Sequence, residues 1–403
     1  MKQNFRPFFY IAFSVLLGVV LAAGLGEALT RVFAPDWLKR RVEELSVKND
    51  TDLGFATALG TDQDWPVEKV NGNFRRFLPD ASFQVRHYEY ETTAHTNALG
   101  LRASPHACTS HPRHPIPFTG DSFTFGLGVE DEETFIDLLN KQGNRCFLNF
   151  GIPGSSLKEQ LDILKMRHKE LGRPKVYIFG VFVGNELSDL EVRSKQFAGD
   201  KPWDPNAPEL RDKGWGLKRF LKPLNSFIRT NELLRRSFLV QFVKAKLLAL
   251  YNSRRVQTGG RQYFGEEVFY TMQNDQHFKD MFTLFTDQLN RLKELSQALH
   301  FKYCFVLIPD RHQVDDELRQ NKVQYYDLAS GTMNYRLINE RMGKEFTKRK
   351  IRYVDLLPCL REKFASDKAQ RFYYSYDNHF TAQGHLAAFE CMEKDLAQNL
   401  KKL

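Results

Sequence analysis

Beyond about residue 115, short apolar runs alternate with longer segments of helical periodicity, and this alternation limits the possible folds of the chain. Runs of this length indicate buried strands, whereas the longer periodic segments indicate helices. Strands that alternate with helices form βαβ units, whose crossovers place helices on both faces of a parallel sheet. The expected strands are Ile116–Thr119, Cys146–Phe150, Val176–Phe182, Tyr303–Ile308 and Ile351–Leu357. The expected helices are Glu133–Lys141, Leu157–Leu171, Phe278–His300, Gln324–Arg349 and Thr381–Lys402.

The parts of the chain outside this alternation define the expected domain organisation. Residues 1–35 are expected to form an N-terminal membrane anchor. Residues 36–114 are expected to form a lead-in region that packs on the core and contains one strand, the alternating run Phe83–Tyr90. Residues 115–403 then form the α/β domain. Within it, the stretch from about 190 to 277 is too long for a single connection and is expected to be a helical insertion.

The segment Phe8–Gly26 contains no charged residue. As a helix, its 19 residues would span about 28 Å, which is close to the thickness of a bilayer core. A cleaved signal peptide is the alternative, because Lys2 and Arg6 make a basic start and Ala22–Gly24 resembles a cleavage site. The apolar run is longer than the apolar region of a typical signal peptide, which favours a retained anchor. The short basic flank before it favours a cytoplasmic N-terminus, with the globular part in the periplasm or outside the cell.

The net charge of +9 is concentrated in the insertion. Residues 211–261 contain 13 Lys and Arg against two acidic residues, so this stretch carries +11 and the rest of the chain −2. Leu234, Phe238 and Phe242 within it have near-helical spacing, which predicts an amphipathic helix with a basic face. Such a helix could pack on the sheet with its charges in solvent, contact anionic headgroups, or bind an acidic polysaccharide. Nucleic acid is not expected as a partner, because no nucleic-acid-binding motif accompanies the charge.

The cysteines and histidines give no sign of a metal site. Five cysteines, an odd number without CxxC spacing, indicate neither a zinc site nor a disulfide framework. No cluster of His, Cys and Asp has the spacing of metal ligands, and neither a metal nor an organic cofactor is expected. The sequence carries no signal for an oligomeric state.

Reactive residues follow four of the five expected strands. In an open parallel sheet, ligands bind beyond the carboxyl ends of the strands, so side chains that follow the strands are the first candidates for a site. These candidates are Gly120–Phe123 after the first strand, Asn149–Gly154 after the second, Gly184–Glu186 after the third and Asp377–His379 beyond the fifth.

These residues can be assigned roles in acyl transfer. A serine hydroxyl becomes an effective nucleophile when a base takes its proton, and the base needs a third group to fix its tautomer. Ser122, His379 and Asp377 fill these roles as nucleophile, base and orienting acid. The oxyanion that forms during acyl transfer needs donors already in place. The candidate donors are the backbone N–H of Ser122, the backbone N–H of Gly154 and the side-chain amide of Asn185.

Other residues near the strand ends are expected to have structural roles. His385 could replace the base, but it lies in a helical pattern and is expected to be a packed or solvated helix residue. Ser155 and Ser156 are expected to cap the helix that begins at Leu157. Arg311, after the fourth strand, could contact a carboxylate or phosphate of the substrate, although an ion pair within the loop is the favoured interpretation.

The order of these blocks resembles that of the SGNH (GDSL-like) hydrolases: Gly-Asp-Ser, then glycine, then Gly-x-Asn, then Asp and His near the end of the chain. Asn97–Arg102 and Gly120–Val129 are similar to the bacterial membrane-anchored branch of that family. The resemblance covers roughly half of the chain. It implies a three-layer flavodoxin-like domain with a central parallel sheet, and esterase or O-acetyl transfer activity on sugars, lipids or envelope polymers.

Two positions depart from the family pattern. Where many members have Gly-x-Asn-Asp, this chain has Gly184-Asn185-Glu186, which keeps the negative charge and should leave the amide of Asn185 in place. The final block commonly reads Asp-x-x-His, whereas one residue separates Asp377 from His379. The shorter spacing also occurs in polysaccharide-modifying relatives.

The expected function is that of a serine esterase. It would remove an acyl group, such as acetyl, from a cell-envelope carbohydrate or lipid through an acyl-Ser122 intermediate that water resolves. An O-acyltransferase would use the same triad to pass the acyl group to a sugar hydroxyl, and exclusion of water would distinguish the two. A non-catalytic envelope protein that binds glycan on the same scaffold is the alternative from a different class.

Overall fold

The computed structural model describes residues 21–34, 39, 65–70, 74–87, 89–106, 115–143, 145–197, 234, 237–243, 276–325, 334–375 and 377–403. The chain divides into two compact units. The larger unit comprises Phe55–Ala207, Tyr263–Arg319 and Gly331–Leu403. The smaller unit comprises Met1–Gly54, Pro208–Gln262 and Gln320–Ser330.

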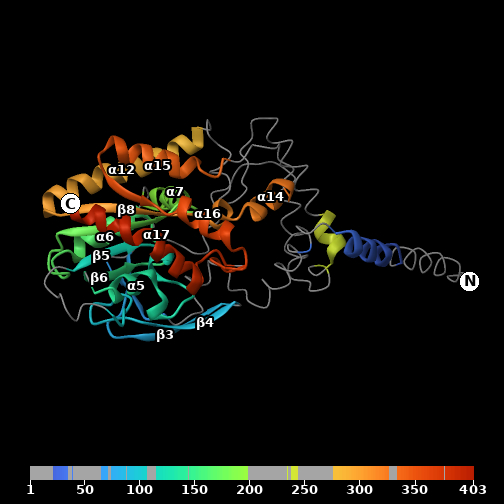
Figure 1. Ribbon diagram of the computed structural model, residues 1–403, viewed down its shortest axis with the longest axis horizontal. Helices are drawn as coiled ribbons and strands as arrows, with labels where there is room; N and C mark the ends of the chain where they lie inside the picture. Colours follow the sequence, from blue (N-terminus) through green and yellow to red (C-terminus); the bar gives the residue numbers. More distant parts are fainter. Residues whose placement is uncertain are drawn as a thin grey trace, which may run out of the picture. The chain divides into compact units, whose positions relative to one another are not determined.

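A five-stranded parallel sheet forms the centre of the larger unit (Figure 1). Its strands are β5 (Ile116–Gly120), β6 (Phe147–Gly151), β7 (Val176–Phe182), β8 (Lys302–Ile308) and β9 (Arg352–Asp355). Their spatial order is β6-β5-β7-β8-β9, which is the order of flavodoxin-like sheets. The predicted α/β class with a parallel sheet is confirmed, and each predicted strand begins and ends within two residues of the observed one.

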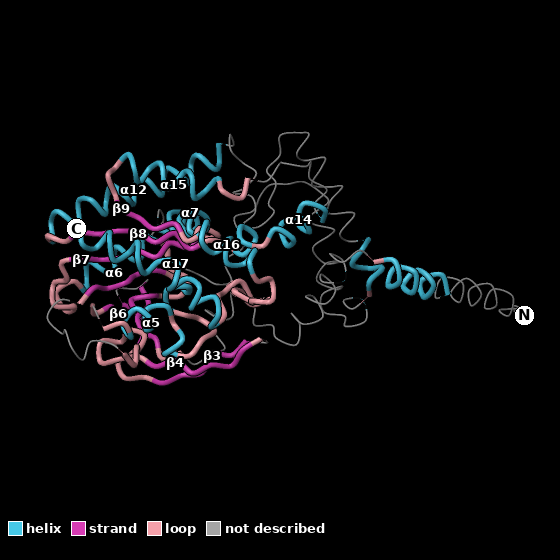
Figure 2. Tube along the Cα trace, in the orientation of Figure 1, coloured by secondary structure: helices cyan, strands magenta, loops and turns pink. Residues whose placement is uncertain are grey.

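Helices cover both faces of this sheet and complete three layers (Figure 2). Successive residues of a strand point to opposite faces, and β8 shows this clearly. Its Val306 packs into a core formed with α5 (Phe135–Lys141), α16 (Leu357–Ser366) and α17 (Ala382–Lys401). Its Phe305 packs into a second core, formed with α6 (Leu157–Arg167), α7 (Glu186–Phe197), α12 (Gln276–Leu299) and α15 (Leu337–Lys348). Burial on both faces explains why the central strands form unbroken apolar runs in the sequence.

The helix boundaries differ from the prediction mainly after β8. The predicted single helix Gln324–Arg349 is wrong, because α14 (Asp316–Tyr325) ends one residue after its predicted start and α15 begins only at Leu337. The helix α16 was not predicted, because the apolar pattern of β9 continues into it; Pro358 lies in its first turn, where the missing N–H costs no helical hydrogen bond. The predicted start of α17 is confirmed by its N-cap, since the Thr381 side chain accepts a hydrogen bond from the N–H of Gly384.

The lead-in region contains two antiparallel strand pairs. β1 (Val67–Val70) pairs with β2 (Phe74–Phe77), and β3 (Ser82–His87) pairs with β4 (Tyr90–His95). The predicted strand Phe83–Tyr90 is therefore wrong at its end, because it runs through the turn between β3 and β4. Alternation of polar and aromatic residues continues across this turn and hides it in the sequence.

The hairpin β3–β4 packs against the segment that follows β5. Phe83, Val85 and Ala94 of the hairpin share a buried cluster with Phe125 and Leu127. This packing brings the hairpin next to α4 (Ser122–Phe125), the short helix at the end of β5. Two further short helices are described in the larger unit, η1 (Asp131–Glu133) and α13 (Arg311–Val314).

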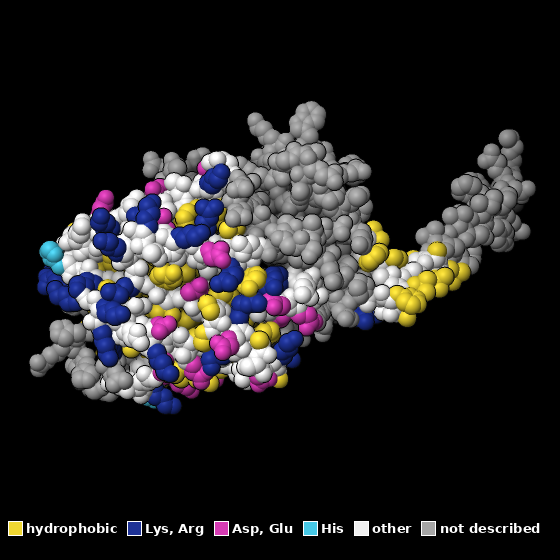
Figure 3. Space-filling model, turned by 45° about the horizontal axis from the view of Figure 1, so that its top comes forward, with side chains coloured by type: hydrophobic (Ala, Val, Ile, Leu, Met, Phe, Trp, Pro, Cys, Tyr) yellow, Lys and Arg dark blue, Asp and Glu magenta, His cyan; other side chains and the backbone are white. Residues whose placement is uncertain are grey.

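In the smaller unit, residues 21–33 form a helix. The predicted anchor Phe8–Gly26 lies outside the described residues up to residue 20. Within the described part of the chain, no helix combines the length and the apolar character needed to cross a membrane. Apolar side chains lie exposed along the helix of residues 21–33, among them Leu25, Leu29 and Val32 (Figure 3).

The predicted insertion at about residues 190–277 lies mostly outside the described residues. A short helix at residues 238–243 is described in it, within the predicted amphipathic segment. The Glu27 carboxylate accepts hydrogen bonds from the N–H groups of Phe238 and Leu239, at 2.9 and 3.0 Å, and from the hydroxyl of Ser237 at 2.6 Å. The start of this helix is thereby tied to the helix of residues 21–33.

A disulfide joins Cys359 of α16 to Cys391 of α17. The odd number of cysteines gave no indication of this bridge, because pairing depends on which side chains the fold brings together. Cys146 is disulfide-bonded as well, and Cys304 is a buried free thiol. The Cys359–Cys391 bridge encloses the loop that carries Asp377 and His379.

Candidate active site

Ser122 lies just beyond the carboxyl end of β5, as the first residue of α4. The helix begins here because the Asp121 carboxylate accepts a hydrogen bond from the N–H of Phe123 at 3.0 Å. The helix lies directly against the strand ends, since a Cβ on Gly151 of β6 would overlap the backbone of Phe125. Ser122 is therefore held in a fixed place at the edge of the sheet, with 1% of its surface exposed.

The structure brings the three expected catalytic residues into one hydrogen-bonded chain. His379 Nε2 lies 2.7 Å from Ser122 Oγ, and His379 Nδ1 lies 2.7 Å from Asp377 Oδ1. When Nδ1–H donates to the carboxylate, Nε2 carries the lone pair that can accept the serine proton. This is the arrangement that serine hydrolases use to make a hydroxyl nucleophilic.

The charges around His379 favour its role as a proton acceptor. Burial lowers the pKa of His379, but the Asp377 carboxylate more than offsets this, and the pKa lies above its ordinary value. Burial would raise the pKa of Asp377, yet His379 and a hydrogen bond from Tyr90 hold that pKa well below its usual range. Asp377 therefore stays ionised at neutral pH and can stabilise an imidazolium at His379.

The three expected oxyanion donors follow three neighbouring strands. Ser122 follows β5, Gly154 follows β6 and Asn185 follows β7, and these strands are adjacent in the order β6-β5-β7. Gly154 has a φ of 73°, in the left-handed region that favours glycine. The hydroxyl of Ser155 donates to the carbonyl of Gly120 at 3.2 Å, which ties the loop after β6 to the end of β5.

The amide of Asn185 lies beside the Asp121 carboxylate and acts to lower the pKa of that acid. An amide has two N–H groups, which can donate to a substrate oxygen. Burial raises the pKa of Asp121 to about 6, although the N–H of Phe123, the nearby His379 and Asn185 act in the opposite direction.

Glu186, the departure from the family pattern, joins two elements of the fold. Its carboxyl group accepts a hydrogen bond from the N–H of Leu157, the first residue of α6, at 2.9 Å. The same helix has Ser156 as its N-cap and a capping box with Glu159, so the predicted capping role of Ser156 is confirmed. Burial raises the pKa of Glu186 well above its ordinary value.

The two alternative candidates at the rim have structural contacts. His385 is buried in α17, where its Nδ1 accepts a hydrogen bond from the N–H of Phe135 at 3.2 Å. Burial lowers its pKa to about 3, and the interpretation as a packed helix residue is confirmed. Arg311 donates to the backbone carbonyl groups of Tyr374 and Ser375, at 3.0 and 2.6 Å. Residues 371–380 are called the triad loop below. Arg311 thus forms hydrogen bonds with backbone carbonyl groups of this loop, whereas an ion pair was expected.

The contacts of three residues with the triad loop were not expected from the sequence. The hydroxyl of Tyr90 donates to Asp377 Oδ2 at 2.7 Å. The Glu89 carboxylate accepts from the N–H of Asp377 at 2.9 Å. On the other side, Asp310 Oδ2 accepts from Asn378 Nδ2 at 2.6 Å. Glu89 and Tyr90 lie almost 290 residues before the loop, and no local spacing pattern connects them to it.

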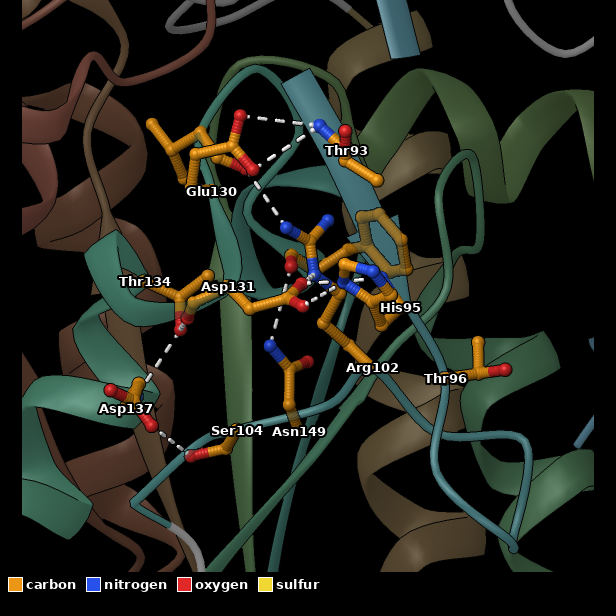
Figure 4. A network of polar contacts seen from close by, with 12 residues as sticks. Thr93, His95, Thr96, Arg102, Ser104, Glu130, Asp131, Thr134, Asp137 and Asn149 are labelled. Atoms are coloured by element: carbon orange, nitrogen blue, oxygen red, sulfur yellow. Dashed lines mark hydrogen bonds and ion pairs between the residues drawn. The ribbon is translucent and has the colours of Figure 1, made fainter. Parts of the chain in front are cut away.

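A second polar network fixes the chain that follows the nucleophile (Figure 4). The guanidinium of Arg102 is buried over the ring of Phe125, forms an ion pair with Asp131 at 2.6 Å and donates to the carbonyl of Val129 at 2.8 Å. His95 Nδ1 lies 2.6 Å from the other carboxylate oxygen of Asp131. Arg102 ends the stretch Asn97–Arg102, and its role in this structure is to hold the segment between α4 and η1.

No group of three or more His, Cys, Asp or Glu side chains is placed to hold a metal ion in the part of the chain that the structure describes.

The sequence matches no protein-family model and no curated protein. Several solved structures are similar to it. A member of the lipolytic protein G-D-S-L family from Veillonella parvula is 12% identical, with a TM-score of 0.34 over 72% of this chain and 100% of that one. A GDSL-like lipase from Bacteroides thetaiotaomicron is 11% identical, with a TM-score of 0.30 over 75% and 93% of the two chains. An acetyl xylan esterase is 12% identical, with a TM-score of 0.32 over 69% and 98%. At these values the likenesses carry no argument about the reaction, which depends on the geometry of the site.

Proposed function

We propose that this chain is a serine esterase that removes an O-acyl group, such as acetyl, from a cell-envelope carbohydrate or lipid. The observation that carries the proposal is the unbroken chain of hydrogen bonds from Ser122 Oγ through His379 to Asp377. The same three groups at these distances provide a nucleophile, a base and an orienting acid for acyl transfer.

In the first half of the reaction, Ser122 Oγ attacks the carbonyl carbon of the ester while its proton passes to His379 Nε2. The carbonyl oxygen becomes an oxyanion, which the N–H groups of Ser122 and Gly154 and the amide of Asn185 would stabilise. The bond to the alcohol oxygen then breaks. His379 returns its proton to that oxygen, so the alcohol leaves neutral and the acyl group remains on Ser122.

In the second half, a water molecule attacks the acyl-serine while His379 takes one of its protons. The intermediate collapses when the bond to Ser122 Oγ breaks, and His379 gives the proton back to Ser122. The products are a carboxylic acid and the free enzyme. Asp377 keeps its negative charge throughout and stabilises the imidazolium in both halves.

We also propose that the enzyme is anchored by its N-terminal segment and works in the periplasm or outside the cell. The uncharged run Phe8–Gly26 and the exposed apolar side chains of residues 21–33 support the anchor. The Cys359–Cys391 disulfide supports an oxidising compartment, since such bridges are rare in the cytosol. An envelope carbohydrate or lipid is the ester that a protein in this place would meet.

Turnover of p-nitrophenyl acetate by the full-length chain tests the esterase. The wild type should release nitrophenol, Ser122→Ala should not, and Ser366→Ala on the exposed end of α16 should match the wild type. A wild type no faster than Ser122→Ala would leave the scaffold as a non-catalytic binding protein.

A second arm separates hydrolysis from transfer. The assay is repeated with an added sugar acceptor, and the acetylated sugar is sought by mass spectrometry. Hydrolysis predicts the same rate of nitrophenol release without the acceptor and acetate as the product. A rate that rises from near zero when the sugar is added, with acetyl sugar as the product, would identify a transferase.

A further inference from the structure

The triad acid Asp377 has a second hydrogen-bond partner outside its own loop. Its oxygen Oδ1 lies 2.7 Å from His379 Nδ1, and its oxygen Oδ2 accepts a hydrogen bond from the hydroxyl of Tyr90 at 2.7 Å. A carboxylate that is nearly buried needs a donor on each oxygen to remain charged at low cost. Tyr90 meets that need from the first residue of β4, in the lead-in region.

The neighbouring residue Glu89 binds the backbone of the triad loop at Asp377. One of its carboxylate oxygens accepts from the N–H of Ser375 at 2.7 Å, and the other accepts from the N–H of Asp377 at 2.9 Å. A carboxylate that binds two N–H groups of one loop fixes the direction of that loop as well as its position. The adjacent residues of the hairpin turn thus constrain both the main chain and the side chain of the triad acid.

The hairpin, the triad loop and the segment after the nucleophile meet at Gly128. Its φ is 91°, and a Cβ there would lie 2.9 Å from the Tyr374 ring and 3.0 Å from the Tyr90 ring. The two rings are in contact, with centroids 4.7 Å apart, and the Tyr374 hydroxyl donates to the Gly128 carbonyl at 2.6 Å. Tyr90 therefore has little room to take another orientation, because it is enclosed by the two segments that carry the nucleophile and the base.

We propose that Glu89 and Tyr90 are positioning residues for the acyl-transfer triad, which they serve by fixing the Asp377 carboxylate against His379. The inference rests on the proposed function. The lead-in region, which lies outside the predicted α/β domain, would thus take part in the chemistry. Neither residue touches the reacting atoms, and both act through Asp377.

Replacing the hydroxyl of Tyr90 should change the basicity of His379. The groups that face Asp377 are His379, Tyr90, Glu89 and His87, with Tyr374 beside it. The hydrogen bond from the Tyr90 hydroxyl stabilises part of the negative charge of the Asp377 carboxylate. Without this bond, the carboxylate should interact more strongly with the imidazole of His379. The pKa of His379 should rise, and the low-pH limb of kcat/KM should move to higher pH.

The experiment compares Tyr90→Phe with Tyr374→Phe in the full-length chain. The control removes a hydroxyl from the same pair of rings, and that hydroxyl binds the Gly128 carbonyl rather than the Asp377 carboxylate. Tyr90→Phe should lower kcat about 10-fold with KM nearly unchanged, since a hydrogen bond to a charged group is lost from the catalytic machinery. It should also shift the low-pH limb and the downfield proton resonance of His379, whereas Tyr374→Phe should do neither.

Glu89 is tested by Glu89→Gln against Glu91→Gln. Glu91 lies on the exposed side of the same hairpin, paired with Arg86. Glu89→Gln should reduce kcat and leave the thermal midpoint close to that of Glu91→Gln. Equal pH profiles and equal kcat in Tyr90→Phe and Tyr374→Phe, in an enzyme whose wild type is active, would overturn the inference and leave the proposed function standing. Inactivity of the wild type would overturn the proposed function, while the imidazole resonance would still report whether Tyr90 acts on the Asp377–His379 pair.

Discussion

His379 Nε2 lies 2.7 Å from Ser122 Oγ, although 257 residues separate the two in the chain. The fold makes this contact in two steps. The flavodoxin-like strand order places the end of β5 between the ends of β6 and β7, where Ser122 begins α4. The loop before α17 then returns to the same edge, held by Asp310 and Arg311 after β8 and by the hairpin of the lead-in region.

The rate of ester cleavage should depend on the ionisation of His379. The imidazole must be neutral to accept the Ser122 proton, and its pKa lies above its ordinary value of 6.5. The rate constant kcat/KM should therefore fall as the pH is lowered, with a midpoint above 6.5. A pH–rate profile between pH 5 and 9 measures it. A rate that stays constant down to pH 5 would show that His379 is not the base.

Replacing Asp377 by Asn should remove most of the activity and leave the fold intact. The amide has the shape of the carboxylate, but it cannot hold the tautomer of His379 that exposes Nε2 to the serine. We expect a loss in kcat of about 10⁴-fold, as at other triads of this type. Asp367→Asn, in the exposed turn after α16, is the control. A loss of less than about 10-fold would argue against a charged orienting residue at Asp377.

Asn185→Ala tests the oxyanion site. The loss of one donor to the oxyanion should lower kcat by about 10²–10³-fold, and KM should change little because the donor acts mainly in the transition state. Steady-state kinetics separate the two constants. A raised KM with an unchanged kcat would place Asn185 in substrate binding.

Glu186 should make the stability of the fold depend on pH. Its pKa in the folded state lies well above 4.5, so the folded state keeps a proton that the unfolded state releases. Stability should thus be greatest below the unfolded pKa and should fall as the pH rises toward the folded pKa. Glu186→Gln keeps an acceptor for the N–H of Leu157 and removes the titration. Urea unfolding at pH 5 and pH 8 should show a smaller loss of stability with rising pH for this variant than for the wild type or for Glu362→Gln, on the exposed face of α16. Equal losses would contradict the account of Glu186.

The Cys359–Cys391 bridge should stabilise the triad loop that it encloses. Its two cysteines are 32 residues apart, and closing a loop of that length in the unfolded chain should contribute about 3–4 kcal/mol. The double variant Cys359→Ala, Cys391→Ala should unfold at a lower temperature under non-reducing conditions. An unchanged midpoint would mean that the packing of α16 on α17 suffices without the bridge.

The sequence was most informative where local patterns and chain order coincide with spatial neighbours. Strands such as β7 are apolar throughout because both faces are buried. Ser122 and Asn185 follow strands whose ends meet at one edge of a parallel sheet, and His379 lies in the loop before α17, which returns to the same edge. The contacts of Glu89 and Tyr90 with the triad loop were beyond this reasoning, because they join segments nearly 290 residues apart and depend on side-chain geometry. The turn between β3 and β4 was missed for a different reason, since the alternating pattern continues through it.

The site also differed from expectation in its supporting contacts. Arg311 reaches the edge of the sheet as the strand order implies, but its partners are two backbone carbonyls, which no composition or spacing can indicate. Glu186 was expected to keep the negative charge of the usual aspartate and to leave the amide of Asn185 in place, and the contact of its carboxyl group with the start of α6 was not expected. For both residues the sequence predicted the preceding strand correctly, but the direction of the side chain depends on packing in the folded chain.

Labelling with a fluorophosphonate tests the central claim most directly, because this reagent forms a stable bond to a serine that a neighbouring base has activated. The full-length chain is treated with the reagent, digested and mapped by mass spectrometry, in parallel with Ser122→Ala and His379→Ala. The account predicts one adduct, on the peptide that contains Ser122, which is absent in Ser122→Ala and strongly reduced in His379→Ala. Labelling of the wild type no greater than that of Ser122→Ala, or an adduct on another serine, would contradict it.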